Sequence, residues 1–346
     1  MSTPQINRDV FPYFTLSHYS SENRLPSEGF IKIKKIDQNY YLINEDDIID
    51  EYTGNDKSVK IETIEELYEI INSGANVHIE YSENSTITEQ FLIDKGQTIT
   101  LDLLSDTVID SQGSIGSSSR LFQINDGTLI INGNGATSTS SNESYGVFRV
   151  EANGKLELNN LVLNNSRGWG LNVKILGGEA ILNNVVINST TGGGIEVTEA
   201  NLGTSSQTGI ATLNNCTFTQ SGYQDHCSTC LSVSGGSKLI INSGTYISND
   251  GYSLYVFSSG GQIEVNDGMF QGNKDGICMI AAIDTQTYPQ YEGGFVINGG
   301  QFTGDASIKV PAYLVINKGT FTFDPTQYVD TSVHTVTESD GKYVVE

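Results

Sequence analysis

A short pattern returns eight times along this chain: an apolar residue, any residue, a second apolar residue, and then asparagine. The repeat asparagines are Asn132, Asn159, Asn183, Asn214, Asn242, Asn266, Asn298 and Asn317. Successive ones lie 27, 24, 31, 28, 24, 32 and 19 residues apart. Self-similarity at such a period is typical of stacked structural repeats, each of which buries its apolar face on its neighbours.

The residues around each repeat asparagine alternate as a β-strand requires. The positions one and three residues before it are apolar in all eight repeats, as Ile131 and Leu129 are in the first. Spacing of two places both side chains on one face of a strand. Two and four residues after the asparagine, early repeats pair medium side chains, such as Leu161 with Leu163, and late repeats pair glycine with an aromatic ring. A small residue beside a large one keeps the interior volume constant, so we expect a continuous packed core.

Asparagine at a fixed corner has two uses. It tolerates left-handed backbone angles, and stacked asparagine side chains can hydrogen-bond as a ladder. A further group of strands is predicted before the repeats, which gives three short strands per turn. These strands are Phe148–Val150, Leu171–Val173, Ile195–Val197, Leu231–Val233 and Leu254–Val256.

With these features, residues 98–323 resemble the right-handed parallel β-helix, or pectate-lyase-like, superfamily. The last repeats, Ile297–Asp305 and Ile316–Val329, are also similar to repeats in surface proteins of gut bacteria. The resemblance implies an all-β fold, a right-handed single-stranded parallel β-helix. It does not imply one function, because lyases, hydrolases, adhesins and phage fibres share this fold.

Four segments follow from the pattern. Residues 1–58 lack the repeat and contain a predicted hairpin over Phe30–Ile43; we interpret them as an attachment arm or module, with a folded cap as the alternative. Residues 59–97 form a helix-containing N-terminal cap. Residues 98–323 form the β-helix, and residues 324–346 form a C-terminal cap.

Both caps have sequence signals. Thr63 to Asn72 is predicted to be a helix, because Thr63 and Glu66 match a capping box. Val333–Thr337 and Lys342–Val345 flank an Asp-Gly pair that is typical of a hairpin turn. Such caps cover the strand edges that a β-helix otherwise exposes at its ends.

Composition narrows the classes of partner. The chain has 41 acidic and 18 basic residues and a net charge of −23, which argues against nucleic-acid binding. No apolar stretch approaches the ~20 residues of a membrane span. The polar residues after Met1 do not match a secretory signal. This favours a protein assembled in the cytoplasm, although removal of a signal would leave the same sequence.

The four cysteines predict no metal site. Cys216 falls at an inward position, whereas Cys227 and Cys230 form a CxxC pair after His226 in a polar loop. A structural zinc site needs four ligands, and too few are local here. A disulfide between Cys227 and Cys230 and a pair of free thiols both remain open.

Long insertions mark the candidate binding face. Glu199–Gly209 and Ala282–Gly294 are expected to leave the same corner, three coils apart, and Ser221–Thr229 leaves another corner. Exposed aromatic rings beside carboxylates suit sugar binding; the alternative is that the rings cover the ends of the loops. The candidate ligand-binding residues are Trp169, Tyr223, Asp225, His226, Asp284, Tyr288 and Tyr291.

No catalytic residue or cofactor is predicted. Lyases of this superfamily use calcium held by clustered aspartates with an arginine base, but no aspartate triplet surrounds Arg149 or Arg167. Asp250 and Asp275 could pair as in glycoside hydrolysis, but each precedes glycine and fits a turn. Interior positions are apolar throughout.

Together these features favour a non-enzymatic structural protein of a tailed-phage virion: a head fibre, a capsid decoration or a tail-associated spike. Residues 1–58 would bind capsid or tail proteins, and the rod would display loops to host-surface or mucosal glycans. Resemblance to phage fibres implies a homotrimer. The alternatives are a bacterial cell-surface adhesin whose signal was removed, and a polysaccharide lyase or glycoside hydrolase.

Overall fold

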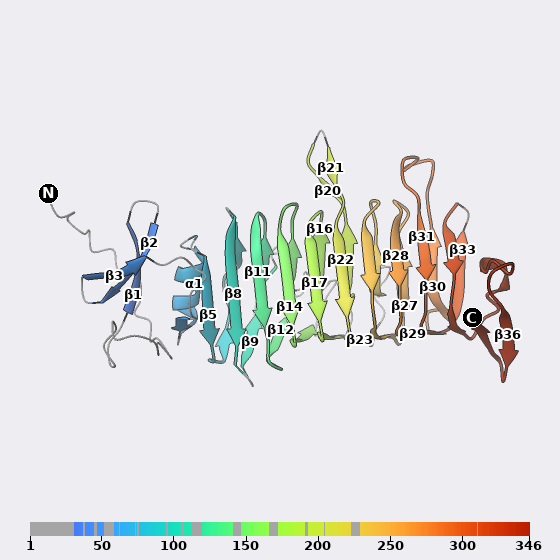
Figure 1. The fold of residues 1–346 in the computed structure, drawn as a ribbon, viewed down its shortest axis with the longest axis horizontal. Coiled ribbons are helices and arrows are strands. Elements are labelled where there is room, and N and C mark those ends of the chain that lie inside the picture. Colours follow the sequence, from blue (N-terminus) through green and yellow to red (C-terminus); the bar gives the residue numbers. More distant parts are fainter. Residues whose placement is uncertain are drawn as a thin grey trace.

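The computed structural model shows an elongated, nearly all-β protein (Figure 1). It describes residues 31–36, 39–44, 47–51, 59–61, 63–72, 74, 76–94, 96–104, 107–111, 120–140, 147–165, 172–190, 193–203, 205–222, 229–309 and 311–346. Within this part of the chain, no helix has the length and apolarity that a bilayer span requires.

Three parallel sheets run along the rod, and each coil adds one strand to each of them. The motif sheet, which carries the repeat asparagines, has eleven strands in chain order. They are β4 (Val59–Ile61), β5 (Val77–Tyr81), β8 (Gln97–Leu103), β11 (Gly127–Asn132), β14 (Lys155–Asn159), β17 (Glu179–Asn183), β22 (Ile210–Asn214), β25 (Lys238–Ile241), β28 (Gly261–Val265), β31 (Gly293–Ile297) and β34 (Tyr313–Ile316).

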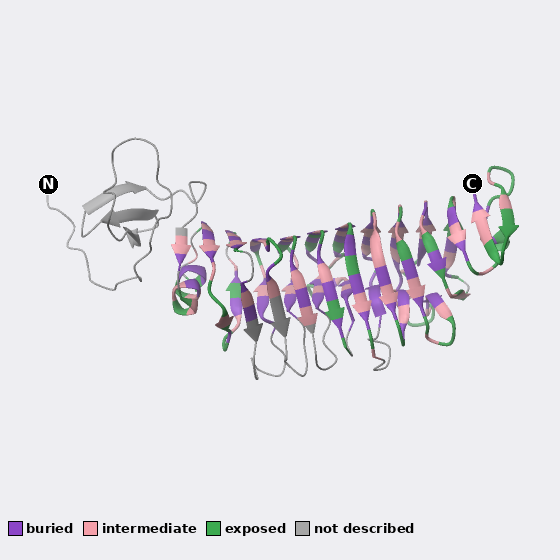
Figure 2. Cartoon of the chain, turned by 90° about the horizontal axis from the view of Figure 1, so that it is seen from below, coloured by how far each residue is buried: buried purple, intermediate pink, exposed green. Residues whose placement is uncertain are grey.

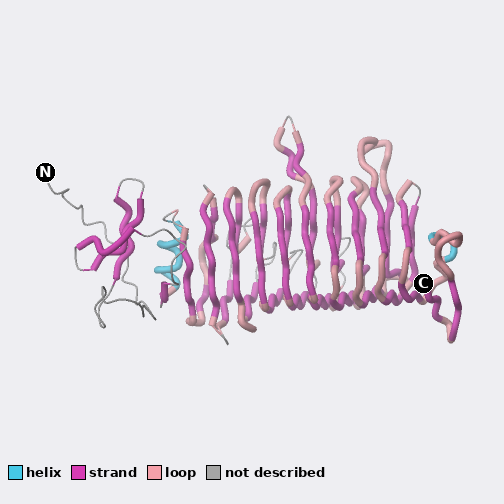
Figure 3. The backbone as a smooth tube through the Cα atoms, in the orientation of Figure 1, coloured by secondary structure: helices cyan, strands magenta, loops and turns pink. Residues whose placement is uncertain are grey.

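The second sheet follows each repeat asparagine and forms the straight lower edge of the rod in Figure 3. Its parallel strands are β6 (Ser85–Thr86), β9 (Val108–Ser111), β12 (Thr137–Ser140), β15 (Val162–Asn165), β18 (Val186–Ser189), β23 (Cys216–Gln220), β26 (Gly244–Ser248), β29 (Met269–Gly272), β32 (Gln301–Thr303) and β35 (Gly319–Phe321).

The third sheet completes each coil. Its strands are β7 (Phe91–Ile93), β10 (Phe122–Ile124), β13 (Phe148–Val150), β16 (Val173–Leu176), β19 (Ile195–Thr198), β24 (Thr229–Val233), β27 (Tyr252–Val256), β30 (Ile277–Ala282) and β33 (Asp305–Lys309). The predicted strand at Leu171–Val173 is wrong by two residues, because Phe148 pairs with Val173 and Val150 with Ile175. The predicted fold class, a parallel β-helix with three strands per turn, is confirmed.

The core is mainly a column of apolar side chains, but the expectation of an apolar interior throughout is wrong, because Asn172, Gln220 and Ser248 are also buried. The residues directly before the repeat asparagines, from Ile131 to Ile316, pair with one another in register along the motif sheet. Each of these side chains is at most 1% exposed. Buried and outward positions alternate along the strands in Figure 2. Burial of one such aliphatic side chain stabilises the fold by about 1.5–3 kcal/mol, so the repeat itself holds the rod together.

Aromatic rings stack where the late repeats carry glycine. Tyr246, Phe270, Phe302 and Phe321 form a column with ring centroids 4.8 to 5.1 Å apart. Two residues before Phe270, Gly268 has a φ of +134°, and an added Cβ would lie 3.1 Å from the Phe270 ring. Glycine therefore provides both the backbone angle and the space for the ring.

The repeat asparagines form a continuous ladder of side-chain hydrogen bonds. In each rung, Nδ2 donates to Oδ1 of the preceding coil at 2.7 to 3.0 Å, from Asn317 back to Asn132. Asn132 in turn donates to Asp102 Oδ1 at 2.6 Å, and His78 Nε2 lies 2.7 Å from Asp102 Oδ2. A carboxylate therefore ends a ladder in which every donor points the same way.

The left-handed corner lies one residue later than the sequence suggested. Asn160, Asn184 and Asn215, which directly follow repeat asparagines, have φ of +53°, +53° and +54°. Their side chains form a shorter ladder, in which Asn184 Nδ2 donates to Asn160 Oδ1 at 3.2 Å and Asn215 Nδ2 to Asn184 Oδ1 at 2.8 Å. The repeat asparagine therefore forms the long ladder, and in these three coils the asparagine that follows it adopts the left-handed backbone angle.

A helix covers the N-terminal end of the rod. α1 (Ile64–Asn72) has the predicted capping box: Glu66 N donates to Thr63 Oγ1 at 3.2 Å, and Thr63 N donates to Glu66 Oε2 at 3.1 Å. Tyr68 stacks on Phe91 of the third sheet with ring centroids 4.5 Å apart. Parallel pairing already begins before residue 98, since β4 and β5 belong to the motif sheet.

An antiparallel hairpin extends the second sheet at the other end. It comprises β36 (Val336–Ser339) and β37 (Lys342–Val345), and β37 pairs with β35. Asp340 and Gly341 have φ of +53° and +72°, as the turn prediction requires. The first strand was predicted three residues too early, because Val333 is 70% exposed and lies outside the hairpin.

The N-terminal segment contains a three-stranded antiparallel sheet. β1 (Ile31–Ile36) pairs with β2 (Asn39–Asn44), and β2 pairs with β3 (Asp47–Glu51). The predicted hairpin is therefore confirmed, with Ile36 opposite Asn39. Most of residues 1–58, to which the sequence assigned attachment, lie outside the described residues.

Candidate functional site

Two tall loops leave one edge of the rod, between the third sheet and the motif sheet. One connects β19 to β22 and the other connects β30 to β31. Both rise above the shorter turns between them in Figure 1. We call residues 199–209 and 282–294, with the turns at Gly235, Gly236 and Gly260, the loop face. The shared corner is the one that the insertion lengths predicted.

The first loop is a small hairpin fixed to the coil beneath it. β20 (Ala200–Asn201) pairs antiparallel with β21 (Ser206–Gln207). Gly203 at its tip has a φ of +87°, and its N–H donates to Asn201 Oδ1 at 2.9 Å. Gln207 Nε2 donates to the carbonyl of Gly177 at 2.8 Å. These contacts give the projecting loop a defined conformation.

The second loop begins with a turn around Asp284. Its Oδ1 accepts hydrogen bonds from the backbone N–H of Gln286 at 3.0 Å and of Thr287 at 3.2 Å. Hydrogen bonds from the Thr287 side chain and backbone hold the pKa of Asp284 below its usual value. The Asp284 N–H donates to the carbonyl of Ser258 at 2.9 Å, which attaches the loop to a neighbouring turn. Asp284 is therefore an ionised group whose carboxylate shapes the loop.

Tyr291 connects the two loops. Its hydroxyl donates a hydrogen bond to Glu199 Oε2, and this bond raises the pKa of Tyr291. Tyr291 lies over the turns of the two coils between the loops. An added Cβ at Gly236 would lie 3.2 Å from Tyr291 Cδ1, and one at Gly260 would lie 3.0 Å from Tyr291 Cβ. The glycines leave room for the ring, and the ring orients both loops.

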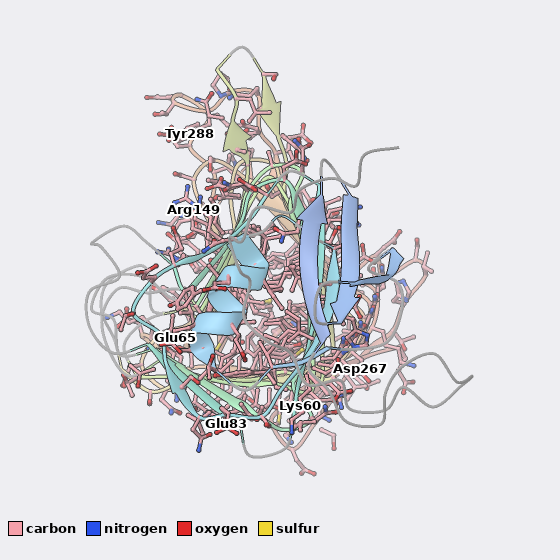
Figure 4. The ribbon with its side chains drawn as sticks, turned by 90° about the vertical axis from the view of Figure 1, so that its left-hand side faces the viewer. Lys60, Glu65, Glu83, Arg149, Asp267 and Tyr288 are labelled. Atoms are coloured by element: carbon pink, nitrogen blue, oxygen red, sulfur yellow. The ribbon has the colours of Figure 1, made fainter. Side chains whose placement is uncertain are left out.

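Three of the predicted binding residues therefore lie together. Asp284, Tyr288 and Tyr291 share the second loop, and the rings of Tyr288 and Tyr291 are 6.3 Å apart at an angle of 42°. Figure 4, which looks along the rod, shows Tyr288 on the projection that the loops form. Trp169, Tyr223, Asp225 and His226 lie outside the described residues.

The sequence reasoning missed a second aromatic group next to the loop face. Tyr252, Tyr255 and Phe257 are half-buried on β27 and in the turn that follows it. The Tyr255 and Phe257 rings are 4.2 Å apart, and the Tyr252 and Tyr255 rings are 5.9 Å apart. The sequence contains a signal for this group: Tyr255 and Phe257 alternate with the buried Leu254 and Val256, which places the two rings on the outer side of the sheet.

A pocket of about 400 Å³ lies at a different corner, between the asparagine ladder and the C-terminal hairpin. Its lining combines amide and backbone groups, such as those of Asn298 and Gln301, with the charged Asp267, Lys318 and Glu346. Such groups can donate and accept hydrogen bonds, but the projecting loops offer aromatic faces as well. The loop face is therefore the stronger candidate for sugar binding.

The described residues contain no cluster of three His, Cys, Asp or Glu side chains that could hold a metal ion. Cys216, Cys230 and Cys278 are buried free thiols; burial raises the pKa of Cys216 to about 11 and of Cys278 to about 12. Thiols that stay neutral at pH 7 are poor nucleophiles and ligands. Cys227 lies outside the described residues.

Arg149 and Asp275, two residues of the enzymatic alternative, contact charged residues close to them in the chain. Arg149 Nε donates to Glu151 Oε1 within the third sheet region. Asp275 has a φ of +53° in a turn before Gly276, and its carboxylate lies 3.7 Å from Lys274 Nζ. These contacts agree with the interpretation of Asp275 as a turn residue. Arg167 lies outside the described residues.

No protein-family model matches the chain, and no curated protein or solved structure gives a match.

Proposed function

We propose that this chain is a non-enzymatic display rod, a structural protein of a tailed-phage virion whose loop face binds host-surface or mucosal glycans. The observation that carries the proposal is the Tyr291–Glu199 hydrogen bond between loops on separate coils. It orients a projection that carries the Tyr288 ring and the ionised Asp284. A preorganised site loses less conformational entropy on binding, so a small projecting surface can hold a ligand.

The chemistry of the loop face suits a neutral or basic sugar. Aromatic rings pack against the apolar faces of sugar rings, and carboxylates accept hydrogen bonds from hydroxyl groups. The net charge of −23 disfavours strongly acidic polysaccharides unless a cation intervenes. The rod supports display, because its coils are stacked in register over the full length of the three sheets. The virion assignment rests on the resemblance to phage fibres and on the non-repetitive N-terminal segment.

Binding is tested by applying the purified chain to an array of bacterial-surface and mucosal glycans. Tyr288→Ala should abolish the signal, whereas Tyr288→Phe, which keeps the ring and removes the hydroxyl, should retain most of it. Far-UV circular dichroism must show that both variants are folded. Equal binding by Tyr288→Ala and the parent chain would refute the loop-face assignment.

The proposed location in a virion and the proposed lack of enzymatic activity are tested by separate experiments. Mass spectrometry of purified phage particles should detect the chain; its recovery from cell envelopes and not from particles would favour the adhesin. Incubation with pectin, alginate and host capsule should release no unsaturated or reducing ends. Release that disappears in Asp284→Asn would replace the display proposal with an enzymatic one.

A further inference from the structure

The second sheet lacks charged residues over a long run of strands, β12 (sequence TSTS) and the seven strands that follow it. Strands β15, β18, β23, β26, β29, β32 and β35, all within the described residues, contain no Asp, Glu, Lys, Arg or His. One outward row is Val162, Val186, Thr217, Thr245, Met269, Gln301 and Thr320. The next is Asn164, Asn188, Thr219, Ile247, Gln271 and Thr303. We call these two rows the uncharged face.

The other two sheets carry charged residues on their outer faces. The motif sheet pairs Lys155 with Glu179 at 3.0 Å and Lys238 with Glu264 at 2.7 Å on its outer side. The third sheet carries Lys174 beside Glu196 at 3.3 Å. In a chain with 41 acidic residues, a long face without carboxylates is a specific feature. Depletion of charge is typical of the centre of a protein–protein interface.

Charged residues surround this face. Asp267 and Lys318 are exposed at the corner on the side of the motif sheet, and Asp250 and Asp275 are exposed at the opposite corner. At the C-terminal end, β36 and β37 bring Glu338 and Lys342. An uncharged centre inside a charged rim is the arrangement found in interfaces. In Figure 2, which views the rod from below, the strands lie side by side along the rod axis.

We propose that the uncharged face binds a second copy of this chain, with the two second sheets packed face to face. Each copy carries a net charge of −23, so two copies repel each other least where both surfaces are uncharged. Face-to-face sheets pack about 10 Å apart with interdigitated side chains. Because one face meets its own equivalent, the pair is twofold symmetric, in contrast to the homotrimer that the resemblance implies.

The area of the face agrees with a pair of low affinity. Seven strands spaced ~4.8 Å apart, three to five residues long at ~3.3 Å per residue, cover roughly 450 Å². Two copies therefore bury about 900 Å², which is just below the ~1,000 Å² of a stable specific interface and is typical of a weak, reversible pair. Association in the micromolar range follows, and added salt should strengthen it because salt screens the mutual repulsion of the copies.

The symmetry predicts which residues meet. In a parallel pair every strand faces its own copy, and in an antiparallel pair centred on the middle of the seven strands β26 does so as well. Thr245→Cys should therefore form an intermolecular disulfide on mild oxidation, in a background with Cys227→Ser; the native Cys216, Cys230 and Cys278 are buried. Val162→Cys, at one end of the face, should cross-link when the rods are parallel and not when they are antiparallel.

The deciding experiment measures the mass of the full chain by sedimentation equilibrium at tens of micromolar in low and high salt. The parent chain should approach twice 37.5 kDa. Thr245→Glu places like charges opposite each other and should weaken association roughly 100-fold. The matched control is Thr212→Glu, an outward position on β22 of the motif sheet, which should leave the dimer intact.

Two results would overturn the proposal. One is a monomeric parent chain at every salt concentration with no Thr245→Cys cross-link. The other is a dimer that Thr245→Glu leaves unchanged. Circular dichroism distinguishes unfolding of Thr245→Glu from dissociation, and Thr219→Glu on the adjacent strand repeats the test with a second outward residue. Dimer formation does not depend on glycan binding. A negative result in the dimer assay therefore leaves the glycan proposal standing, and a negative result in the glycan assay leaves the dimer proposal standing.

Discussion

The asparagine ladder predicts a measurable loss of stability when one rung is removed. Asn183 donates to Asn159 and accepts from Asn214, both at 2.7 Å, so Asn183→Ala removes two hydrogen bonds. At about 0.5–1.5 kcal/mol for each bond, the free energy of unfolding should fall by about 1–3 kcal/mol. Asn317, the last rung among the described residues, makes one ladder bond, to Asn298 at 2.8 Å. Asn317→Ala should therefore cost about half as much.

Asn183→Asp tests the direction of the ladder. The introduced carboxyl still accepts from Asn214, but its second oxygen faces Asn159 Oδ1, another acceptor. A flip of the Asn159 amide moves the conflict to Asn132, and a flip of Asn132 moves it to the carboxylate of Asp102. An acceptor–acceptor contact therefore persists until the introduced carboxyl is protonated, which raises its folded-state pKa above the unfolded value of about 3.9.

The raised pKa of the introduced carboxyl determines how the stability of Asn183→Asp changes with pH. Because the folded state binds the proton more tightly than the unfolded state, the stability of Asn183→Asp is lowest at neutral pH and recovers as pH falls through the raised pKa. Urea unfolding followed by circular dichroism at several pH values, with the parent chain and Asn183→Ala measured alongside, checks the argument. A variant as stable as the parent at pH 7, or one that gains nothing relative to Asn183→Ala on acidification, would refute the directional ladder.

Three further predictions concern the core and the loop face. Gly268→Ala should lower the free energy of unfolding by at least about 2–3 kcal/mol, because φ is +134° and the added Cβ would lie 2.9 Å from the Gly244 carbonyl oxygen. Gly276→Ala is the matched control: φ is +76° but the space around the Cβ is open, so this variant should lose about 1–2 kcal/mol in the same urea assay. Tyr291→Phe should accelerate hydrogen exchange in residues 282–294 and change stability by less than about 1.5 kcal/mol; equal exchange in Tyr288→Phe and Tyr291→Phe would contradict the role of the Glu199 bond. Burial raises the pKa of Cys216 to about 11, so the unfolded thiol, with a pKa of about 8.5, ionises first and stability should fall as pH rises between these values. Cys216→Ala should show a shallower fall, and equal slopes would exclude the thiol as the cause.

The sequence predicted the parts of the fold that depend on volume and periodicity. Ile131, Leu158 and Leu182 stack because apolar residues two apart on successive strands must share one interior. The capping box at Thr63 and Glu66 and the turn at Asp340 depend on local chemistry, which a short segment contains in full. Such signals need no knowledge of neighbouring coils.

Features that depend on contacts between coils were predicted less well. The repeat asparagine and the residue after it are both asparagine in three coils, so the sequence did not show which one adopts the left-handed angle. The two tall loops were expected on one side, but their connection through Tyr291 and Glu199 joins residues 92 positions apart. The uncharged face becomes visible only when the outward residues of seven strands are aligned in register.

The two proposed surfaces occupy different sides of the rod, and this leads to a last prediction. The loops leave the upper edge of the rod in Figure 1, whereas the second sheet forms its lower edge. Pairing through the uncharged face therefore leaves the loop faces of both copies accessible.

A dimer with two loop faces should bind a densely glycosylated surface more tightly than a single copy, through effective concentration and without new contacts. Thr245→Glu should thus lower apparent affinity for a dense glycan surface by about 10²–10⁴-fold where both sites can engage at once. Its affinity for the same free glycan in solution should be unchanged, because Thr245 lies on β26 and not on the loop face. Surface binding at high and low glycan density, beside solution calorimetry, separates the two quantities. Equal losses in both assays would mean that the uncharged face contacts the glycan itself, and the division of roles between the two sides would be wrong.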